Sequence, residues 1–286
     1  MRVALITGCS SGFGLLSALA FARRGNKVYA TMRDLSKDGD LQSITNSEQL
    51  PIIILKLDVT DDHSVKQAVS KVLDKEGRID VLVNNAGMGC LGSVEFLSDT
   101  MLRTAFETNF FGVIRMLRAV LPAMRAQGSG TIVNVSSIDG RIPGKPINWG
   151  YAASKHSLGV LSDALALEVE PFGIKVRQIE PGFFATKILT NRKLLEKENA
   201  AANDERSDVD SPYRKFEEAV RGFAEGNMQH SDDPQIVAEA IIEAVNTEAF
   251  FPVHYPVGEE ANATLKEIAT LDEEQQALSW KKMMGL

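Results

Sequence analysis

Short runs of apolar residues alternate along the chain with longer stretches in which apolar residues recur every three or four positions. The short runs are typical of strands buried on both faces of a sheet, and the longer spacing is typical of amphipathic helices. The pattern predicts strands at residues 2–7, 27–32, 52–57, 79–84, 131–136, 174–180 and 250–253. It predicts helices at residues 14–24, 61–75, 99–127, 150–170 and 233–245. This alternation indicates an α/β fold with a doubly wound parallel sheet of about seven strands in a single domain, residues 1–286.

Residues 191–231 depart from this alternation, because they are rich in charged and small residues with only scattered apolar ones. Ligands of open parallel sheets bind beyond the carboxyl ends of the strands, and this segment follows the sixth strand. We therefore expect a helical substrate lid over residues 187–232. A solvated surface excursion is the alternative. Residues 258–286 are expected to form short helices as a C-terminal extension without chemistry of their own.

Composition and charge narrow the class of protein. The 286 residues are 44% hydrophobic and 24% charged, as in ordinary globular proteins, and 31 basic against 38 acidic residues give a net charge of −7. This acidic balance disfavours a nucleic-acid partner. We expect a cytoplasmic protein without a membrane span, because no stretch of 18 apolar residues occurs. Cys9 and Cys90 are expected to be reduced, and the histidine spacing predicts no metal site.

A glycine-rich turn follows the first predicted strand. Glycines lack a Cβ, so they allow a tight turn and a close approach of the backbone to a pyrophosphate, which the next helix N-terminus would face. The spacing is Gly-x3-Gly-x-Gly, which differs from the usual dinucleotide fingerprint, and a purely structural turn is the alternative. The candidate cofactor-binding residues are Gly8, Ser10, Ser11, Gly12, Phe13 and Gly14.

Three motifs in chain order give the chain a family resemblance. They are the turn at residues 7–14, Asn-Asn-Ala-Gly at residues 84–87, and Tyr-Ala-Ala-Ser-Lys at residues 151–155. With them the chain resembles the short-chain dehydrogenase/reductase family over roughly residues 2–253. The resemblance implies a Rossmann-like fold, a nicotinamide cofactor and a cofactor site that includes Asp58, Val59, Asn85, Ala86 and Gly87. Alternatively, Asn85 only stabilises the adjoining turns.

The end of the second predicted strand bears on the choice of cofactor. In Rossmann units an acid there binds the ribose 2′-hydroxyl of NAD, whereas an arginine accommodates the 2′-phosphate of NADP. The family's acid position falls on Met32, and Arg33 follows it. We therefore expect NADP(H) to be favoured. NAD(H) stays possible, because Asp34 can restrain Arg33 or engage a ribose.

Tyr151 and Lys155 are four residues apart, so they share one face of the predicted helix. A nearby ammonium lowers the pKa of a phenol, which makes Tyr151 a usable acid or base for the proton transfer that accompanies hydride transfer. The resemblance implies that Lys155 also binds the nicotinamide ribose and that Asn109 holds a water of a proton relay. It also implies a serine that hydrogen-bonds the substrate oxygen. We assign Ser137, with Ser136 as the alternative, because Ser137 lies one position further from Tyr151 than is common in the family.

The resemblance places Pro181, Gly182, Phe184 and Thr186 beside the nicotinamide. The expected substrate site includes Ser137, Trp149, Tyr151 and Phe183. A mostly apolar wall is expected from Met88, Leu91, Ile142, Trp149, Phe183, Phe184, Ile188 and Leu189.

Such a wall suits a hydrophobic alcohol or ketone. Residues 27–34, 130–137 and 171–173 are similar to the 17β-hydroxysteroid and retinol dehydrogenase branch, which implies a 17β-hydroxysteroid as substrate. The alternatives are a broad carbonyl/aldehyde or retinol reductase and a non-catalytic NADP-binding regulator. The helices at residues 99–127 and 150–170 resemble those that form homodimer and homotetramer contacts in the family.

Overall fold

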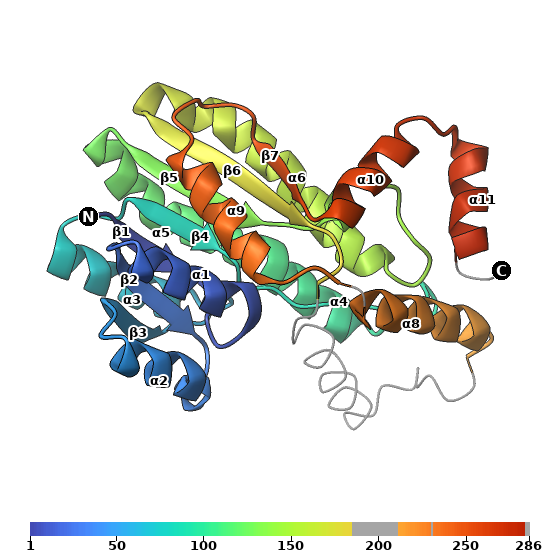
Figure 1. Cartoon of the computed structure of the whole chain (residues 1–286), viewed down its shortest axis with the longest axis horizontal. Helices are drawn as coiled ribbons and strands as arrows, with labels where there is room; N and C mark the ends of the chain where they lie inside the picture. The colour runs from blue at the N-terminus through green and yellow to red at the C-terminus, as the bar shows by residue number, and fades with distance from the viewer. Residues whose placement is uncertain (185–210, 230, 284–286) are drawn as a thin grey trace.

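A parallel sheet of seven strands forms the centre of the computed structural model, which describes residues 1–184, 211–229 and 231–283 (Figure 1). The strand order is β3-β2-β1-β4-β5-β6-β7, and all six neighbouring pairs are parallel. The strands are β1 (Val3–Ile6), β2 (Lys27–Met32), β3 (Ile52–Lys56), β4 (Val81–Asn84), β5 (Gly130–Val135), β6 (Ile174–Pro181) and β7 (His254–Val257). The predicted doubly wound, Rossmann-like sheet is confirmed.

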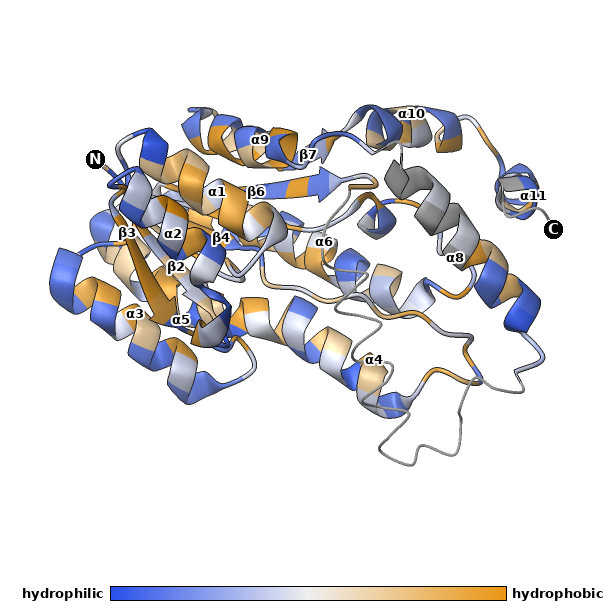
Figure 2. Cartoon of the chain, turned by 60° about the horizontal axis from the view of Figure 1, so that its bottom comes forward, coloured by the Kyte–Doolittle hydropathy of each residue, from blue (hydrophilic) through white to orange (hydrophobic). Residues whose placement is uncertain are grey.

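Helices cover both faces of this sheet and bury two separate apolar cores. One face carries α1 (Gly12–Arg23), α2 (Gly39–Ser47) and α9 (Gln235–Asn246). The other face carries α3 (Asp62–Glu76), α5 (Gly112–Gln127) and α6 (Trp149–Val169). Figure 2 shows hydrophobic residues along β2 and β3, and both hydrophobic and hydrophilic residues on the covering helices α3 and α9. The sheet is therefore buried on both faces, which explains why its strands appear in the sequence as continuous apolar runs.

The seventh strand lies later in the chain than the sequence pattern predicts. The apolar run at residues 250–253 precedes the strand, and Phe251 is 47% exposed. The ladder with β6 instead pairs Gln178 with His254 through to Pro181 with Val257. Pro256 is tolerated because β7 is an edge strand, where a missing N–H can face away from the ladder.

The helix predicted over residues 99–127 is interrupted. It consists of α4 (Asp99–Phe106), a π-helical turn (Glu107–Phe111) and α5. Turns of this kind widen a helix locally and often mark functional sites. The amphipathic spacing on either side hides the interruption from a search for helical periodicity. The short helix α2 is also absent from the predicted set, because among its residues only Leu41 and Thr45 are buried.

Three further helices lie beyond the carboxyl-terminal ends of the strands (Figure 1). They are α8 (Arg214–Gln229), α10 (Glu259–Ile268) and α11 (Glu273–Met283). The expected lid includes residues 187–210 and 230, which lie outside the described residues. Within its described part, Tyr213 just before α8 donates a hydrogen bond to Glu95 at 3.0 Å, which ties this segment to the loop after β4. None of the helices that the structure describes is long and apolar enough to cross a membrane.

Candidate active site

The glycine turn between β1 and α1 is packed so closely that side chains are excluded. A Cβ on Gly14 would lie 2.4 Å from both the Asn85 Nδ2 and the Gly8 carbonyl oxygen. Gly8 and Gly12 have φ angles of +73° and +57°, which favour glycine. At the N-cap of α1 the Ser11 side chain makes no capping hydrogen bond. The turn and the N-terminus of α1 therefore fit a phosphate group, as the sequence predicts.

The Asn-Asn-Ala-Gly motif after β4 holds this turn in place. The Asn85 side chain donates to the carbonyl oxygens of Thr7 and Gly8, at 2.8 and 3.2 Å. The Thr7 hydroxyl accepts hydrogen bonds from the backbone N–H groups of Asn85 and Ala86, both at 3.0 Å. The side chain of Asn85 thus has the turn-stabilising role that the sequence left open, and Asn85 and Ala86 contact the turn.

One basic and one acidic residue, Arg33 and Asp34, follow the end of β2. Met32 is buried, whereas Arg33 is exposed. The Asp34 carboxylate accepts hydrogen bonds from the Ser36 N–H and hydroxyl at 3.0 and 2.7 Å. Asp34 is therefore engaged at the start of a short 3-10 helix, and its carboxylate does not pair with Arg33 in this structure.

The predicted adenine-side residues follow β3, next to this end of β2. The Asp58 carboxylate accepts hydrogen bonds from the Thr60 N–H and hydroxyl, at 3.0 and 2.8 Å. Val59 is buried, and its methyl group would lie 2.8 Å from a Cβ on Gly112.

Tyr151 and Lys155 lie one turn apart on α6, as the sequence predicts. The Lys155 Nζ is 5.8 Å from the centre of the Tyr151 ring and donates to the Val135 carbonyl oxygen at 2.9 Å. Burial lowers the pKa of Lys155 to about 8.

The expectation that Lys155 lowers the pKa of Tyr151 is not met here. Burial and the charge of Asp139 raise that pKa above its ordinary value, and a hydrogen bond with Ser137 opposes them. The burial penalty on the phenolate outweighs the opposing hydrogen bond with Ser137. Tyr151 therefore holds its proton at neutral pH and is placed to act as an acid.

Of the two candidate serines, Ser137 faces Tyr151. Its hydroxyl hydrogen-bonds with Tyr151 and accepts from the Asp139 N–H at 3.1 Å, which caps a short 3-10 helix (Ile138–Gly140). The hydroxyl of Ser136 instead lies 3.4 Å from the Lys155 carbonyl oxygen. The structure thus brings Ser137, Tyr151 and Lys155 together at the carboxyl end of β5.

Asn109 is fully buried in the π-helical turn and joins two parts of the site. Its side-chain oxygen accepts from the Met88 N–H at 2.9 Å, and its amide donates to the Met88 carbonyl oxygen and the Ser154 hydroxyl, both at 3.0 Å. A Cβ on Gly87 would lie 3.3 Å from Asn109 Oδ1 and 3.6 Å from Lys155 Nζ. Asn109 therefore ties the loop after β4 to α6.

The segment after β6 is held by a residue that the sequence did not single out. Glu260 on α10 accepts from the Phe183 N–H at 3.1 Å and lies 2.3 Å from where a Cβ on Gly182 would stand. Phe184 is buried with its ring 5.5 Å from that of Phe13. Pro181 ends β6. Thr186 lies outside the described residues.

The predicted apolar wall is only partly available to a substrate. Trp149 donates from its indole nitrogen to the Gly92 carbonyl oxygen at 3.1 Å, and it packs with Met88 and Tyr151 against a small buried cluster. Ile142 is buried against Trp280 rather than open to a cleft. Ile188 and Leu189 lie outside the described residues.

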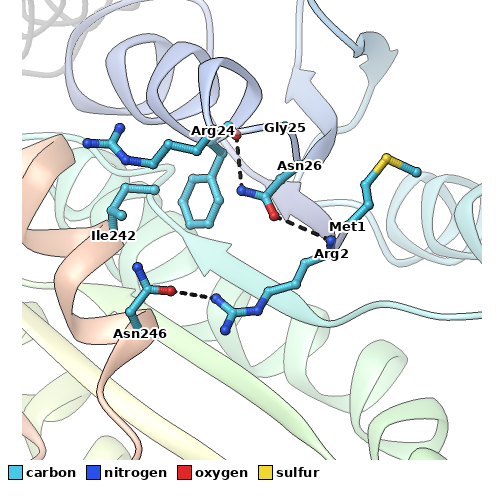
Figure 3. A pocket seen from close by; sticks show the side chains of 8 residues that line it. Met1, Arg2, Arg24, Gly25, Asn26, Ile242 and Asn246 are labelled. Carbon is cyan, nitrogen blue, oxygen red and sulfur yellow. Dashed lines mark hydrogen bonds between the residues drawn. The ribbon is translucent and has the colours of Figure 1, made fainter.

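A cavity of about 400 Å³ lies elsewhere, next to the amino-terminal end of β1 (Figure 3). It lies beside Arg2, whose guanidinium donates to Asn246 at 2.7 Å. Arg2 precedes β1 while the glycine turn follows it, so this cavity is separate from the candidate active site.

Comparison with known proteins is consistent with this geometry. The family model described as short chain dehydrogenase matches residues 2–197. The chain is 43% identical to 3-ketodihydrosphingosine reductase of Bacteroides thetaiotaomicron over 68% of each chain. It is 35% identical to human 17-beta-hydroxysteroid dehydrogenase type 1, over 88% of this chain and 79% of that protein.

A solved short-chain dehydrogenase from Streptomyces avermitilis has the same fold. It superposes with a TM-score of 0.78 at 32% identity, covering 99% of this chain and 97% of that one. The family match spans most of the sheet and includes the glycine turn, Ser137, Tyr151 and Lys155. The chain belongs to the short-chain dehydrogenase/reductase family and is an NAD(P)-dependent oxidoreductase that acts on alcohol and ketone groups.

Proposed function

We propose that the protein interconverts a hydrophobic secondary alcohol and the corresponding ketone, preferring NADP(H), with Tyr151 as the general acid or base. One observation carries this proposal: the Tyr151 phenol hydrogen-bonds with Ser137 and lies one helical turn from the buried ammonium of Lys155. Acid, orienting hydroxyl and cation thus meet beyond the carboxyl end of the sheet, where ligands of such folds bind.

The residues present fit a dinucleotide. The exclusion of any Cβ at Gly14 and the uncapped N-terminus of α1 leave backbone donors for a pyrophosphate, and Arg33 offers an exposed cation. Asp58 to Val59 and Asn85 to Gly87 would form the adenosine side of this site, with Pro181, Gly182, Phe184 and Thr186 at the nicotinamide. When bound, the nicotinamide supplies or accepts the hydride.

Each catalytic residue has a separable task in this proposal. In reduction, Tyr151 donates its proton to the oxygen that becomes the alcohol, and in oxidation its deprotonated form accepts the hydroxyl proton. Ser137 hydrogen-bonds the same substrate oxygen and fixes its position. Lys155 places positive charge near the Tyr151 ring. Asn109 holds the loop after β4 and helix α6 together for proton exchange with water.

Replacement of Tyr151 by Phe tests the mechanism. We expect NADP(H) binding to persist while turnover falls by about 10²-fold or more, because the phenol hydroxyl is the only group changed. Tyr29→Phe is the matched control, since it removes a hydroxyl that bonds Glu76 away from the site. Turnover of Tyr151→Phe equal to that of the control would refute the assignment of Tyr151 as the acid or base.

The preference for NADP(H) rests on the exposed Arg33 and on the buried, uncharged Met32. Arg33→Asp is expected to move the ratio of kcat/KM values toward NAD(H) by at least about tenfold, because a carboxylate repels a 2′-phosphate and accepts from a 2′-hydroxyl. Lys71→Asp on α3 makes the same change of charge as a control. Equal ratios in the two variants would remove Arg33 from the cofactor site.

The half-buried apolar residues Met88, Trp149 and Phe183 and the relatives support the proposed substrate class. Besides the two enzymes above, retinol dehydrogenase 8 of Bos taurus is 42% identical over 70% of this chain and 64% of that protein. The three names refer to different substrates, so they support a hydrophobic alcohol or ketone as a class, with a 17β-hydroxysteroid as our first candidate. Initial rates with estradiol, retinol, 3-ketodihydrosphingosine and small aldehydes separate this candidate from a retinol or broad carbonyl reductase. Cofactor binding with no turnover of any of them would favour the regulator.

We also propose a homodimer or homotetramer that buries α5 and α6. Apolar side chains are exposed on α6, where Val160 is 72% and Leu167 63% exposed, and in the π-helical turn just before α5, where Phe111 is 46% exposed. Exposed apolar residues gathered on neighbouring elements are typical of interfaces. The molar mass in solution, measured by light scattering, tests this proposal.

A further inference from the structure

Lys145 occupies an unusual position in the loop between Ser137 and the catalytic helix. Its ammonium is 3.0 Å from the Asp139 carboxylate, and its side chain is only 12% exposed. The rings of Phe183 and Trp280 lie 5.1 and 5.0 Å from the same nitrogen. The charge of Lys145 is thus held by one carboxylate and two aromatic rings, which come from three separate parts of the chain.

The carboxylate that Lys145 contacts belongs to the immediate surroundings of Tyr151. Asp139 donates its N–H to the Ser137 hydroxyl at 3.1 Å, and its other carboxylate oxygen accepts from the Asn148 amide at 2.8 Å. Its charge is one of the causes that raise the pKa of Tyr151. Any group that neutralises Asp139 therefore acts on the acid of the reaction.

The backbone of this loop is strained in a way that positions Asn148. Ile147 has a φ angle of +67°, and the Asn148 N–H donates to the Pro146 carbonyl oxygen at 2.7 Å, which closes a three-residue turn. A β-branched residue rarely adopts such an angle, so the surroundings must hold it. The Gly92 N–H does so by donating to the Ile147 carbonyl oxygen at 2.8 Å. The loop that carries the extra residue between Ser137 and Tyr151 is therefore held in one conformation by its own hydrogen bonds.

Helix α11 contacts this loop through the side chain of Trp280. Among its described residues only Trp280 is buried, and it packs with Ile138, Ile142 and Ala261. The other residues at 273–282 of this helix are polar or exposed. Trp280 thus anchors α11 against the segment that carries Asp139 and Lys145.

We propose that Lys145 is a positioning residue of the reaction: it neutralises and fixes Asp139 beside Tyr151, and Trp280 of α11 holds Lys145 in place. This inference rests on the proposed function, because it assigns the control of the Tyr151 proton. It gives the C-terminal extension, to which the sequence assigns no chemistry, a part in catalysis.

The charged groups around Tyr151 and Asp139 determine the sign of the effect. Lys155 faces Tyr151 from α6, and Lys145 faces Asp139 from the loop. Arg141, after the 3-10 helix, pairs with Glu180 on β6 at 3.1 Å and does not compensate Asp139. On α10, Glu260 accepts from the Phe183 backbone. Removal of the Lys145 charge leaves Asp139 negative beside Tyr151, so the phenol binds its proton more tightly.

The pH dependence of alcohol oxidation tests this inference on the full chain with saturating cofactor. For Lys145→Met we expect the midpoint of the rise in rate to move to higher pH by about one pH unit, and for Asp139→Asn to move to lower pH. The double variant should lie close to the wild type, because both charges are absent. Lys145→Arg should restore most of the wild-type profile.

Lys27→Met is the matched control, because it breaks a lysine–carboxylate pair of the same 3.0 Å length with Glu76, away from the site. Trp280→Leu keeps the buried volume apolar but removes the ring, and we expect a smaller shift in the same direction as Lys145→Met.

The outcomes separate this inference from the proposed function. If Tyr151→Phe abolishes turnover while Lys145→Met keeps the wild-type pH midpoint, the role of Lys145 is refuted and the mechanism stands. If Lys145→Met and Lys145→Arg lose rate equally with no change in midpoint, the role of Lys145 is structural only. If Tyr151→Phe retains turnover, the proposed function fails and the inference with it.

Discussion

The burial of Lys155 in the candidate active site is expected to reduce the free energy of unfolding of the protein at neutral pH. Burial lowers its pKa from 10.5 to about 8, so the folded state resists the charged form that the unfolded chain carries at neutral pH. A difference of this size corresponds to about 3 kcal/mol of unfolding free energy at 1.36 kcal/mol per pKa unit. Lys155→Met removes this penalty and also loses the hydrogen bond to Val135, which contributes about 1 kcal/mol. We therefore expect the variant to be more stable at pH 7 by about 2 kcal/mol and inactive.

The sign of the pH dependence follows from proton binding. Between pH 8 and 10.5 the unfolded chain binds a proton at Lys155 that the folded protein does not, so this residue makes stability rise with pH. Cys9 acts in the opposite direction, because burial raises its pKa from 9.0 to about 12. The difference between Lys155→Met and wild type cancels the contribution of Cys9. That difference should be largest below pH 8, pass through zero near about pH 10 and reverse in sign at higher pH, where only the lost hydrogen bond to Val135 remains.

Urea unfolding without cofactor, repeated at a series of pH values, measures this difference. Lys175→Met is the matched control, because the Lys175 ammonium also donates to a backbone carbonyl but is paired with Glu248 near the surface. We expect the control to be neutral or slightly destabilising at every pH. A Lys155→Met variant that is no more stable than wild type at pH 7, or a difference that does not change with pH, would refute the argument.

Two further predictions concern the glycine turn and the assembly. Gly14→Ala should destabilise the protein by about 1–3 kcal/mol and abolish cofactor binding, because its Cβ would lie 2.4 Å from the Gly8 carbonyl oxygen. Urea unfolding and cofactor titration measure the two effects, and the control Gly39→Ala, which has open space around it, should alter neither stability nor binding. Leu167→Glu on α6 should lower the molar mass measured by light scattering, while Leu35→Glu, which is also exposed, should leave it unchanged. Binding by Gly14→Ala, or an unaltered mass for Leu167→Glu, would contradict these expectations.

Those features of the fold that depend on local pattern could be predicted from the sequence. Strands β1, β2, β4 and β5 are almost entirely buried and β3 is half-buried, and all five are rich in apolar residues. The edge strand β7 has no apolar run, because its His254 is satisfied by Glu180 on β6 and Asp163 on α6 instead of by apolar packing. Partners so distant in sequence leave no local signal, and the predicted strand was therefore placed on the apolar residues before it.

The candidate site divides in the same way. Tyr151 and Lys155 are on one helix, so their spacing alone places them on one face. The direction of the Tyr151 pKa could not be predicted, because it depends on burial and on Asp139, and neither is visible in a four-residue spacing. Trp280 and Lys145 meet only through the tertiary fold, and the sole sequence signal for their loop was its extra residue.

The site contains two ionisable side chains whose charged forms are disfavoured by burial, and two asparagines whose side-chain hydrogen bonds are satisfied. Lys155 and Tyr151 are held in surroundings that oppose their ionisation. Asn109 makes hydrogen bonds to Met88 and Ser154 through both ends of its amide, and Asn85 fixes the glycine turn. Buried polar groups are costly unless they are paired, so these asparagines are best explained as the framework that keeps the unfavourably buried Lys155 and its neighbour Tyr151 in place. On this view, the buried charge of Lys155 lowers stability at neutral pH and the asparagines around it help to restore it, which is why Lys155→Met should stabilise the fold while a change at Asn109 should not.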